Sequence, residues 1–440
     1  MGRKYVKILC IFPAGLLLNL INIAEGDDVK AHYISSEPLV LHSLPSNESH
    51  HGNYDFFGVF VDANNRIISL YSYEYGEKSF TSVFDGKKWG ESSTSIPFSK
   101  GMVNNGTFQV YGYEASGTMR IYSFSSDMKL SSHPTNTIKD NSRKAIVCLS
   151  PLTGTSDKFF AVGVYTESRL NPFNLLPFLW SGGHGARAEK LFGATVEEDK
   201  VTGYYDVPGP VEENEYVSDI RSVADDNTAH TVWIKHIEYL FNPEVIKYSS
   251  FDLSNKRWSE PEELFRGDED PYKANLYLSP PSLTYDKENV YCAWSLEIGS
   301  RSDLDKKAIG SKMESGVYFC GKTNGHWSKP IKLVDSGSQP RVFVDNYGTV
   351  YIFWIEQNGL FYRYKTGADW SDRCLAVEDK EISKRKRGFS IPSSPPISIS
   401  VDQDNNLHIV YIHKDLRSSK NQERKYKPEE IVYVKLTYQK

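Results

Sequence analysis

The stretch SISVDQDNNLHIVY, residues 398–411, decides the fold of this chain. It combines a strand-like alternation of apolar and polar residues, a polar turn that begins with an aspartate, and a second apolar run that ends in an aromatic residue. The same pattern recurs as FGVFVDANNRIISLY at 57–71, SVADDNTAHTVW at 222–233, SLTYDKENVYCAW at 282–294 and RVFVDNYGTVYIFW at 341–354. The repetition predicts antiparallel hairpins and no helical pattern.

The spacing of these repeats predicts a β-propeller. The turn aspartates Asp225, Asp286, Asp345 and Asp402 follow one another at intervals of 61, 59 and 57 residues. Each clear repeat continues with a second hairpin whose turn precedes a tryptophan, as in NGHW at 324–327. Four short strands in each period are typical of radially arranged sheets. We therefore expect an all-β, seven-bladed propeller, with six blades as the alternative.

The two ends of the chain are expected to share the last blade. The edge-strand sequence SEP at 36–38 stands alone near the N-terminus, whereas the last repeat stops after its third strand at 430–437. A strand within 31–44 would then close the ring. The expected blades are 53–97, 100–140, 144–195, 216–270, 280–335, 338–380, and 396–440 completed by 31–44. Three inserts interrupt them, at 170–180, 193–216 and 384–387.

The N-terminus has the pattern of an export signal. Arg3, Lys4 and Lys7 precede an apolar run over 8–24, and Ala24 and Gly26 fit a cleavage site before Asp27. The sequence thus predicts a signal peptide over 1–26, one propeller domain over 27–440, and a secreted, extracellular or periplasmic protein. An uncleaved anchor in the membrane is the alternative.

Composition narrows the range of partners. The net charge is −5, so no overall positive field attracts nucleic acid. Beyond the leader the cysteines are Cys148, Cys292, Cys320 and Cys374. Cys292 and Cys320 fall on adjacent expected strands of one repeat, and they form either a disulfide or two buried thiols.

Two arginines are the predicted ligand-binding residues. When the repeats are aligned on the turn aspartate, Arg221 and Arg341 take the same position, and Gly58, Ser282 and Ser398 take it elsewhere. Two guanidinium groups near a narrow channel suit an anion such as a carboxylate. The alternative is that each arginine pairs with a neighbouring Asp or Glu.

The opposite side of the expected channel mouth is the end of the second strand. The catalytic candidates there are Glu356, His413, Glu297 and His236, because carboxylates and imidazoles serve general acid–base chemistry on a sugar. An ordinary solvated rim is the alternative. The same register also contains Glu74, Glu167 and Lys235, with Glu114 as the nearest residue in the second blade.

Other histidines are predicted to have simpler roles. His230 and His408 share one register, which favours packing, and other blades place Tyr291 and Tyr351 there. His184 lies in a glycine-rich turn without a partner at metal-ligand spacing. No phosphate loop, nucleophile elbow, paired cysteine motif or calcium-loop spacing occurs, so we expect no cofactor and no metal.

The repeats resemble the BNR-type, sialidase-like propeller superfamily. The resemblance lies in phrases such as SISVDQDNNLHIVY and in the WSEP and WSKP endings at 258–261 and 327–330, and it covers about three quarters of the chain. Sialidases carry an early Arg-Ile-Pro motif that is absent here, and SVFDGKKW at 82–89 only approximates their Asp-box. No catalytic residue carries over by motif. Related lyases use His, Tyr and Arg, which adds interest to His413, His236 and Arg341.

Two functions follow from these observations. The first is a secreted propeller that binds an acidic glycan or an extracellular protein at the channel mouth without catalysis. The second is a carbohydrate-active hydrolase or lyase that acts on acidic glycans. The missing sialidase motif favours the first, because a shared fold does not imply a shared activity.

Overall fold

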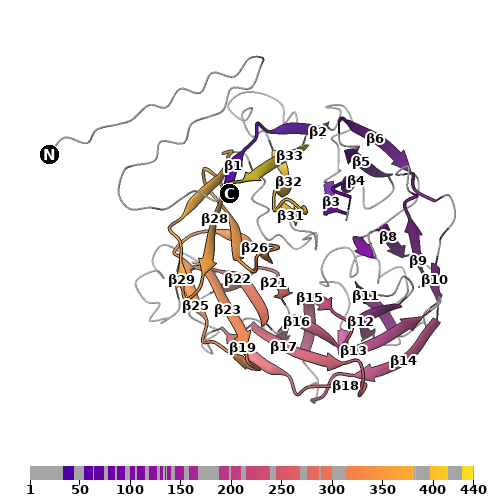
Figure 1. Ribbon diagram of the computed structural model, residues 1–440. Coiled ribbons are helices and arrows are strands. Elements are labelled where there is room, and N and C mark those ends of the chain that lie inside the picture. The colour runs from indigo at the N-terminus through magenta and orange to yellow at the C-terminus, as the bar shows by residue number, and fades with distance from the viewer. Residues whose placement is uncertain are drawn as a thin grey trace, which may run out of the picture.

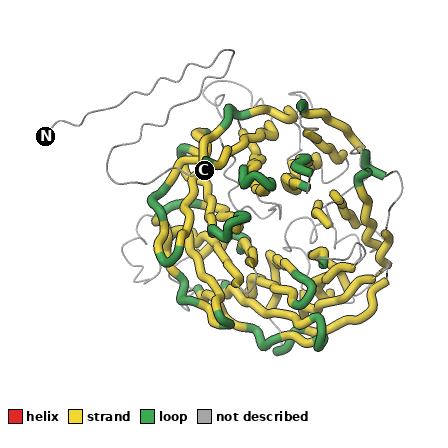
Figure 2. The backbone as a smooth tube through the Cα atoms, viewed as in Figure 1, coloured by secondary structure: helices red, strands yellow, loops and turns green. Residues whose placement is uncertain are grey.

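The computed structural model confirms the seven-bladed β-propeller. Seven antiparallel sheets are arranged around a centre, and the described residues contain strands and loops without a helix (Figures 1 and 2). Among the described residues there is no helix long and apolar enough to cross a bilayer. The described residues are 33–43, 54–62, 64–73, 78–84, 87–94, 100–104, 107–113, 118–125, 129–131, 134, 136–139, 144–152, 158–166, 188–197, 200–209, 215–237, 244–267, 275–286, 289–299, 314–380, 382, 397–414 and 429–439.

The first three blades are four-stranded. Blade one consists of β3 (Tyr54–Val61), β4 (Ile67–Tyr73), β5 (Lys78–Phe84) and β6 (Trp89–Thr94). Blade two consists of β7 (Lys100–Asn104), β8 (Thr107–Tyr113), β9 (Thr118–Ser123) and β10 (Asn136–Lys139). Blade three consists of β11 (Lys144–Pro151), β12 (Lys158–Thr166), β13 (Ala188–Glu197) and β14 (Lys200–Asp206). Residues 200–206 are therefore the fourth strand of this blade, and the predicted insert at 193–216 was wrong there.

Blades four to six have interrupted outer or inner strands. Blade four contains β15 (Glu215–Ala224), β16 (Thr228–Ile237), β17 (Val245–Asp252), β18 (Arg257–Trp258) and β19 (Glu262–Arg266). Blade five contains β20 (Asn275–Leu278), β21 (Ser282–Asp286), β22 (Asn289–Gly299), β23 (Gly316–Thr323), β24 (His326–Trp327) and β25 (Ile331–Val334). Blade six contains β26 (Ser338–Val344), β27 (Val350–Glu356), β28 (Gly359–Thr366), β29 (Asp369–Trp370) and β30 (Cys374–Glu378).

Blade seven joins both ends of the chain, as predicted. It contains β31 (Ile397–Val401), β32 (Leu407–Lys414) and β33 (Glu429–Tyr438), and both β1 (Tyr33–Ser35) and β2 (Leu39–Ser43) pair antiparallel with β33. Figure 1 shows the two N-terminal strands beside the C-terminal one. The edge that β33 would otherwise leave open is thereby paired, which removes a template for aggregation.

The repeated aspartate shapes the turn between the first two strands of a blade. Asp345 Oδ1 accepts hydrogen bonds from the backbone N–H groups of Tyr347 and Thr349, both at 2.9 Å. Asp62, Asp225 and Asp402 bind their own turns in the same way. A short acceptor that satisfies two turn donors explains why the chain repeats this residue type.

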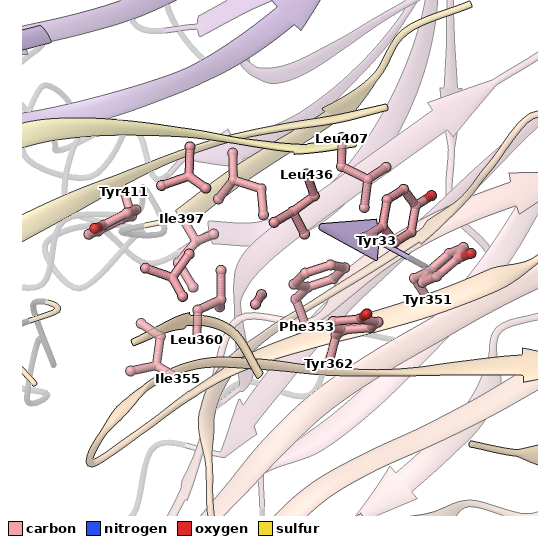
Figure 3. Packing of buried hydrophobic residues seen from close by; sticks show 14 of the residues in the cluster. Tyr33, Tyr351, Phe353, Ile355, Leu360, Tyr362, Ile397, Leu407, Tyr411 and Leu436 are labelled. Atoms are coloured by element: carbon pink, nitrogen blue, oxygen red, sulfur yellow. The ribbon is translucent and has the colours of Figure 1, made fainter. Parts of the chain in front are cut away.

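The core is divided among the blade interfaces. The described residues form seven hydrophobic clusters, each shared by two adjacent blades. Figure 3 shows the cluster between blades six and seven, in which Tyr33 from β1 lies near Tyr351 and Tyr362 from blade six. The N-terminal strand therefore contributes to the core as well as to the sheet edge.

The cysteine pair lies as the sequence placed it. Cys292 and Cys320 are directly opposite each other on β22 and β23, both are buried, and both are free thiols here. Burial raises the pKa of the Cys292 thiol well above its ordinary value, and the neighbouring Cys320 thiol raises it further.

Candidate functional site

One position of the repeat forms a belt around the centre of the ring. It lies four residues before the turn aspartate, on the first strand of the blade, which is the strand nearest the centre (Figure 1). In every regular blade it lies opposite the residue that precedes the aromatic of the second strand. We call the following five residues the central belt: Gly58, Arg221, Ser282, Arg341 and Ser398.

Three belt positions join neighbouring blades. Ser282 Oγ accepts a hydrogen bond from the N–H of Val342 in blade six, and Ser398 Oγ accepts one from the N–H of Val59 in blade one, both at 3.0 Å. Gly58 has a φ of 144°, and a Cβ there would lie 3.2 Å from Ser398 Oγ. Serine and glycine therefore allow the inner strands to approach closely.

The other two belt positions are the predicted arginines, and the structure brings them together. Burial and, to a smaller extent, the positive charge of Arg221 together lower the pKa of the Arg341 guanidinium to about 9. Such an effect requires the two side chains to be near each other, although they come from blades four and six. Two like charges thus share a partly buried region, where charge is poorly solvated.

The guanidinium groups bind backbone carbonyls. Arg341 donates from Nη1 to the carbonyl of Pro340 at 3.2 Å and from Nε to that of Ile397 at 3.3 Å. Arg221 donates from Nη1 to the carbonyl of Ile220 at 2.9 Å. Within the described ranges, no carboxylate forms an ion pair with Arg341. The alternative of a neutralising neighbour therefore fails for Arg341 in that part of the chain.

Both arginines follow the same β-bulge. Between the pairs Ser218–Ile234 and Arg221–Val232 the first strand carries one extra residue, and blade six repeats this between Ser338–Ile355 and Arg341–Phe353. The extra residues are left-handed, because Asp219 has a φ of 53° and Gln339 a φ of 54°. Bulges of this kind redirect side chains, and here they precede the two residues predicted to bind a ligand.

Tyr111 and Cys148 were missed by sequence reasoning and lie beside Arg221. The Tyr111 hydroxyl on β8 accepts a hydrogen bond from the Leu149 N–H at 3.3 Å. Burial raises the pKa of Tyr111 well above its ordinary value, the Cys148 thiol adds to the rise, and Arg221 opposes it. Cys148 Sγ lies 3.8 Å from the carbonyl oxygen of Ile220. Blades two and three depart from the regular repeat, so alignment on the turn aspartate did not find these residues.

His236 lies behind the blade-four bulge. Its Nε2 is 2.7 Å from Ser218 Oγ, and its Nδ1 is 3.3 Å from Glu244 Oε1. The imidazole is only 5% exposed. A side chain so enclosed and so engaged can orient its neighbours, whereas direct contact with a glycan would require it to be uncovered.

The predicted rim residues Glu356 and His413 each have local partners. Glu356 Oε1 accepts from the indole N–H of Trp354 at 2.7 Å, and its Oε2 lies 2.8 Å from Arg373 Nη1. His413 Nδ1 lies 2.8 Å from Asp379 Oδ2, a contact between blades seven and six. Both stay predictions as catalytic groups.

Of the remaining rim residues, the structure describes only Glu297 and Lys235. Glu297 is exposed at the end of β22. Lys235 is partly buried on β16 and lowers the pKa of Glu263 from the same blade, after the larger effect of Arg266. The following predicted residues lie outside the described residues: Glu74, Glu114, Glu167 and His184.

The histidines predicted to pack do so. His230 Nδ1 lies 2.7 Å from the Tyr248 hydroxyl, and His408 Nδ1 lies 2.8 Å from the Tyr433 hydroxyl, the same contact in two blades. Burial lowers the pKa of His230 to about 4. The described residues hold no cluster of three or more His, Cys, Asp or Glu side chains suited to a metal ion.

Comparison with known proteins identifies a shared fold. No protein-family model and no curated protein matches the sequence. Among solved structures, the polysaccharide lyase Uly1 is similar at a TM-score of 0.53 and 8% identity over 89% of this chain and 90% of that one. A protein of unknown function from Dyadobacter fermentans has a TM-score of 0.49 at 10% identity, covering 93% and 100%. An α-L-arabinanase from Penicillium chrysogenum has 0.44 at 11%, covering 91% and 98%. At such low identity, the likeness to Uly1 establishes the propeller scaffold alone.

Proposed function

We propose that this protein binds acidic glycans at the central belt, with Arg221 and Arg341 as the anion-binding groups and without catalysis. The observation that carries the proposal is the proximity of two partly buried guanidinium groups, one of which has a pKa lowered to about 9. An anion between them would relieve their repulsion, and the planar guanidinium group suits a carboxylate or sulfate. Carboxylate and sulfate groups of glycans have the required charge and geometry.

The proposal includes the mature form of the protein and its location. The leader-like sequence at 1–26 supports export of residues 27–440 as one propeller domain, to the outside of the cell or the periplasm. The sialidase-like resemblance of the repeats is a further part of this proposal. Extracellular acidic glycans would be accessible to a protein in that location.

Turnover of an acidic polysaccharide is the second candidate. The observation behind it is that Tyr111, which burial and the Cys148 thiol keep in its proton-bearing form, lies near Arg221. Because Tyr111 is only 2% exposed, it would exchange a proton with a substrate only after binding had uncovered it. Uly1, which shares this fold, is a polysaccharide lyase by its description. The predicted candidates Glu356, His413, Glu297 and His236 remain to be tested within this alternative.

The test is a glycan array followed by calorimetry on residues 27–440. We expect binding to uronate-containing or sulfated glycans that the Arg221→Ala/Arg341→Ala double variant loses. Arg257→Ala, which removes an exposed arginine from the outer strand β18, is the matched control and should bind normally. Equal binding by wild type and double variant would overturn the proposal. Formation of unsaturated uronate or a new reducing end on incubation would establish the second candidate instead.

A further inference from the structure

We propose that Ser218 and His236 are positioning residues that hold Arg221 in its anion-binding orientation. This rests on the proposed function of the central belt. Both side chains are buried, Ser218 at 2% exposed and His236 at 5% exposed, so they act on Arg221 and do not touch the ligand themselves. They act through the bulge of blade four, which sets where the guanidinium of Arg221 points.

The first step is the link between the bulge and the guanidinium. The residue after the left-handed one turns its carbonyl toward the arginine that follows: Ile220 accepts from Arg221 Nη1, and Pro340 accepts from Arg341 Nη1. Each carbonyl projects from a bulge whose backbone path the preceding left-handed residue helps to fix. Anything that holds Asp219 at a φ of 53° therefore also orients Arg221.

The second step is the chain of contacts that holds Asp219. Ser218 Oγ donates to Asp219 Oδ2 at 2.9 Å and lies 2.7 Å from His236 Nε2. A hydroxyl has one hydrogen and an ionised carboxylate only accepts, so Nε2 of His236 donates in the second contact. His236 Nδ1 is 3.3 Å from Glu244 Oε1, and Glu244 Oε2 accepts from the Leu278 N–H of blade five at 2.7 Å.

The third step is the comparison with blade six, which has the bulge without the chain. Gln339 replaces Asp219, and its buried side-chain carbonyl oxygen has no hydrogen-bond partner within the described ranges. The residue in the register of His236 is Gln357, which is exposed. Pro340 stiffens this bulge instead, because its ring fixes φ. Ile220, at the same place in blade four, has no such ring, so contacts from side chains must restrict the backbone there.

The experiment measures sulfate binding by calorimetry on residues 27–440. We expect Ser218→Ala and His236→Gln each to weaken sulfate binding about tenfold, equivalent to about 1.4 kcal/mol. Ser218→Thr keeps the hydroxyl and should restore binding. Ser338→Ala, at the equivalent serine of blade six, should bind like wild type and is the matched control.

A second readout separates this proposal from the function on which it rests. Phenylglyoxal modifies accessible arginines, and mass spectrometry gives the rate at each residue without any ligand. We expect Ser218→Ala to change the rate at Arg221 and to leave Arg341 unchanged. Should the double arginine variant bind sulfate normally, the proposed function fails, while this rate still tests positioning. Unaltered Arg221 reactivity and sulfate affinity in folded Ser218→Ala and His236→Gln proteins would overturn the positioning role. If either protein fails to fold, Asp219→Ala, which removes the acceptor of the Ser218 hydroxyl, provides the same two readouts.

Discussion

Blades four and six present arginine from the same place in the central belt, yet they hold it differently. Blade six relies on its backbone, through Pro340 and the carbonyl of Ile397 in the next blade. Blade four relies on side chains, through Ser218 and His236. One bulge geometry can therefore be fixed by a proline ring or by a buried chain of polar contacts, and only the latter is sensitive to substitutions at a distance.

The largest change in binding is expected from removing Arg341, which has no carboxylate partner among the described residues. Arg341→Ala should weaken binding of acidic glycans about a hundredfold, equivalent to about 3 kcal/mol. Its melting temperature should stay equal or rise, because the change removes a poorly solvated charge that Arg221 repels. Calorimetry and thermal denaturation measure the two effects. A large fall in melting temperature would instead indicate that Arg341 has a structural role.

Alkaline pH provides a second way to distinguish the blades. The pKa of Arg341 lies at about 9, below the usual value for arginine, so the charged form is disfavoured in the folded protein and is lost as pH rises through that value. Sulfate affinity should fall roughly tenfold between about pH 8 and pH 10.

The Arg221→Ala variant should move this fall to higher pH, because one of the two causes of the lowered pKa is removed. Titrations of wild type and variant with sulfate, which stays ionised throughout, give the two midpoints. Coincident midpoints would show that the two guanidinium groups do not interact.

Acid should destabilise blade four before blade six. His230 of blade four has a pKa lowered to about 4 by burial, and blade six has Tyr351 in that register, which takes up no proton in acid. Above the ordinary histidine pKa, His230 is neutral in both the folded and the unfolded protein, so it does not change the stability there. As pH falls toward about 4, the unfolded chain gains a proton that the folded protein resists, and up to about 3 kcal/mol of stability is lost.

The His230→Phe variant tests this loss. Denaturant unfolding at about pH 7.5 and pH 4.5 should show a smaller acid-induced loss for the variant than for wild type. Equal losses would assign the acid sensitivity to other groups.

The smallest effect compares the two left-handed residues. Gln339→Gly should raise the free energy of unfolding by about 1 kcal/mol, because glycine tolerates a positive φ and the buried, unpartnered carbonyl oxygen is removed. Asp219→Gly gains the same backbone freedom but loses the contact with Ser218, so its net change should be smaller. Urea denaturation of both variants gives the two changes in the free energy of unfolding. Equal increases would argue against a stabilising contact between Ser218 and Asp219 in blade four.

The sequence predicts most where local chemistry repeats. The turn aspartate, the following aromatic and the hairpin turns are each determined by neighbours in the chain, so the blades and the belt position of Arg221 and Arg341 could be read directly. Contacts that depend on three-dimensional closure could not. The approach of Tyr111 to Arg221 joins blades two and four across residues distant in sequence. The strand-end register likewise took no account of the local partners Arg373 and Asp379, which contact Glu356 and His413.

The pairing of β1 and β2 with β33 also sets the order of events during synthesis. Tyr33 packs against residues from blades six and seven, and β2 pairs with Glu430–Tyr433, so β1 and β2 must wait for β33. A ribosome must have made the chain through β33 before the ring can close, and bringing together strands so far apart in sequence is slow. Until then blade seven lacks its outer strands, and the unfinished chain has an exposed sheet edge that is open to pairing with another chain.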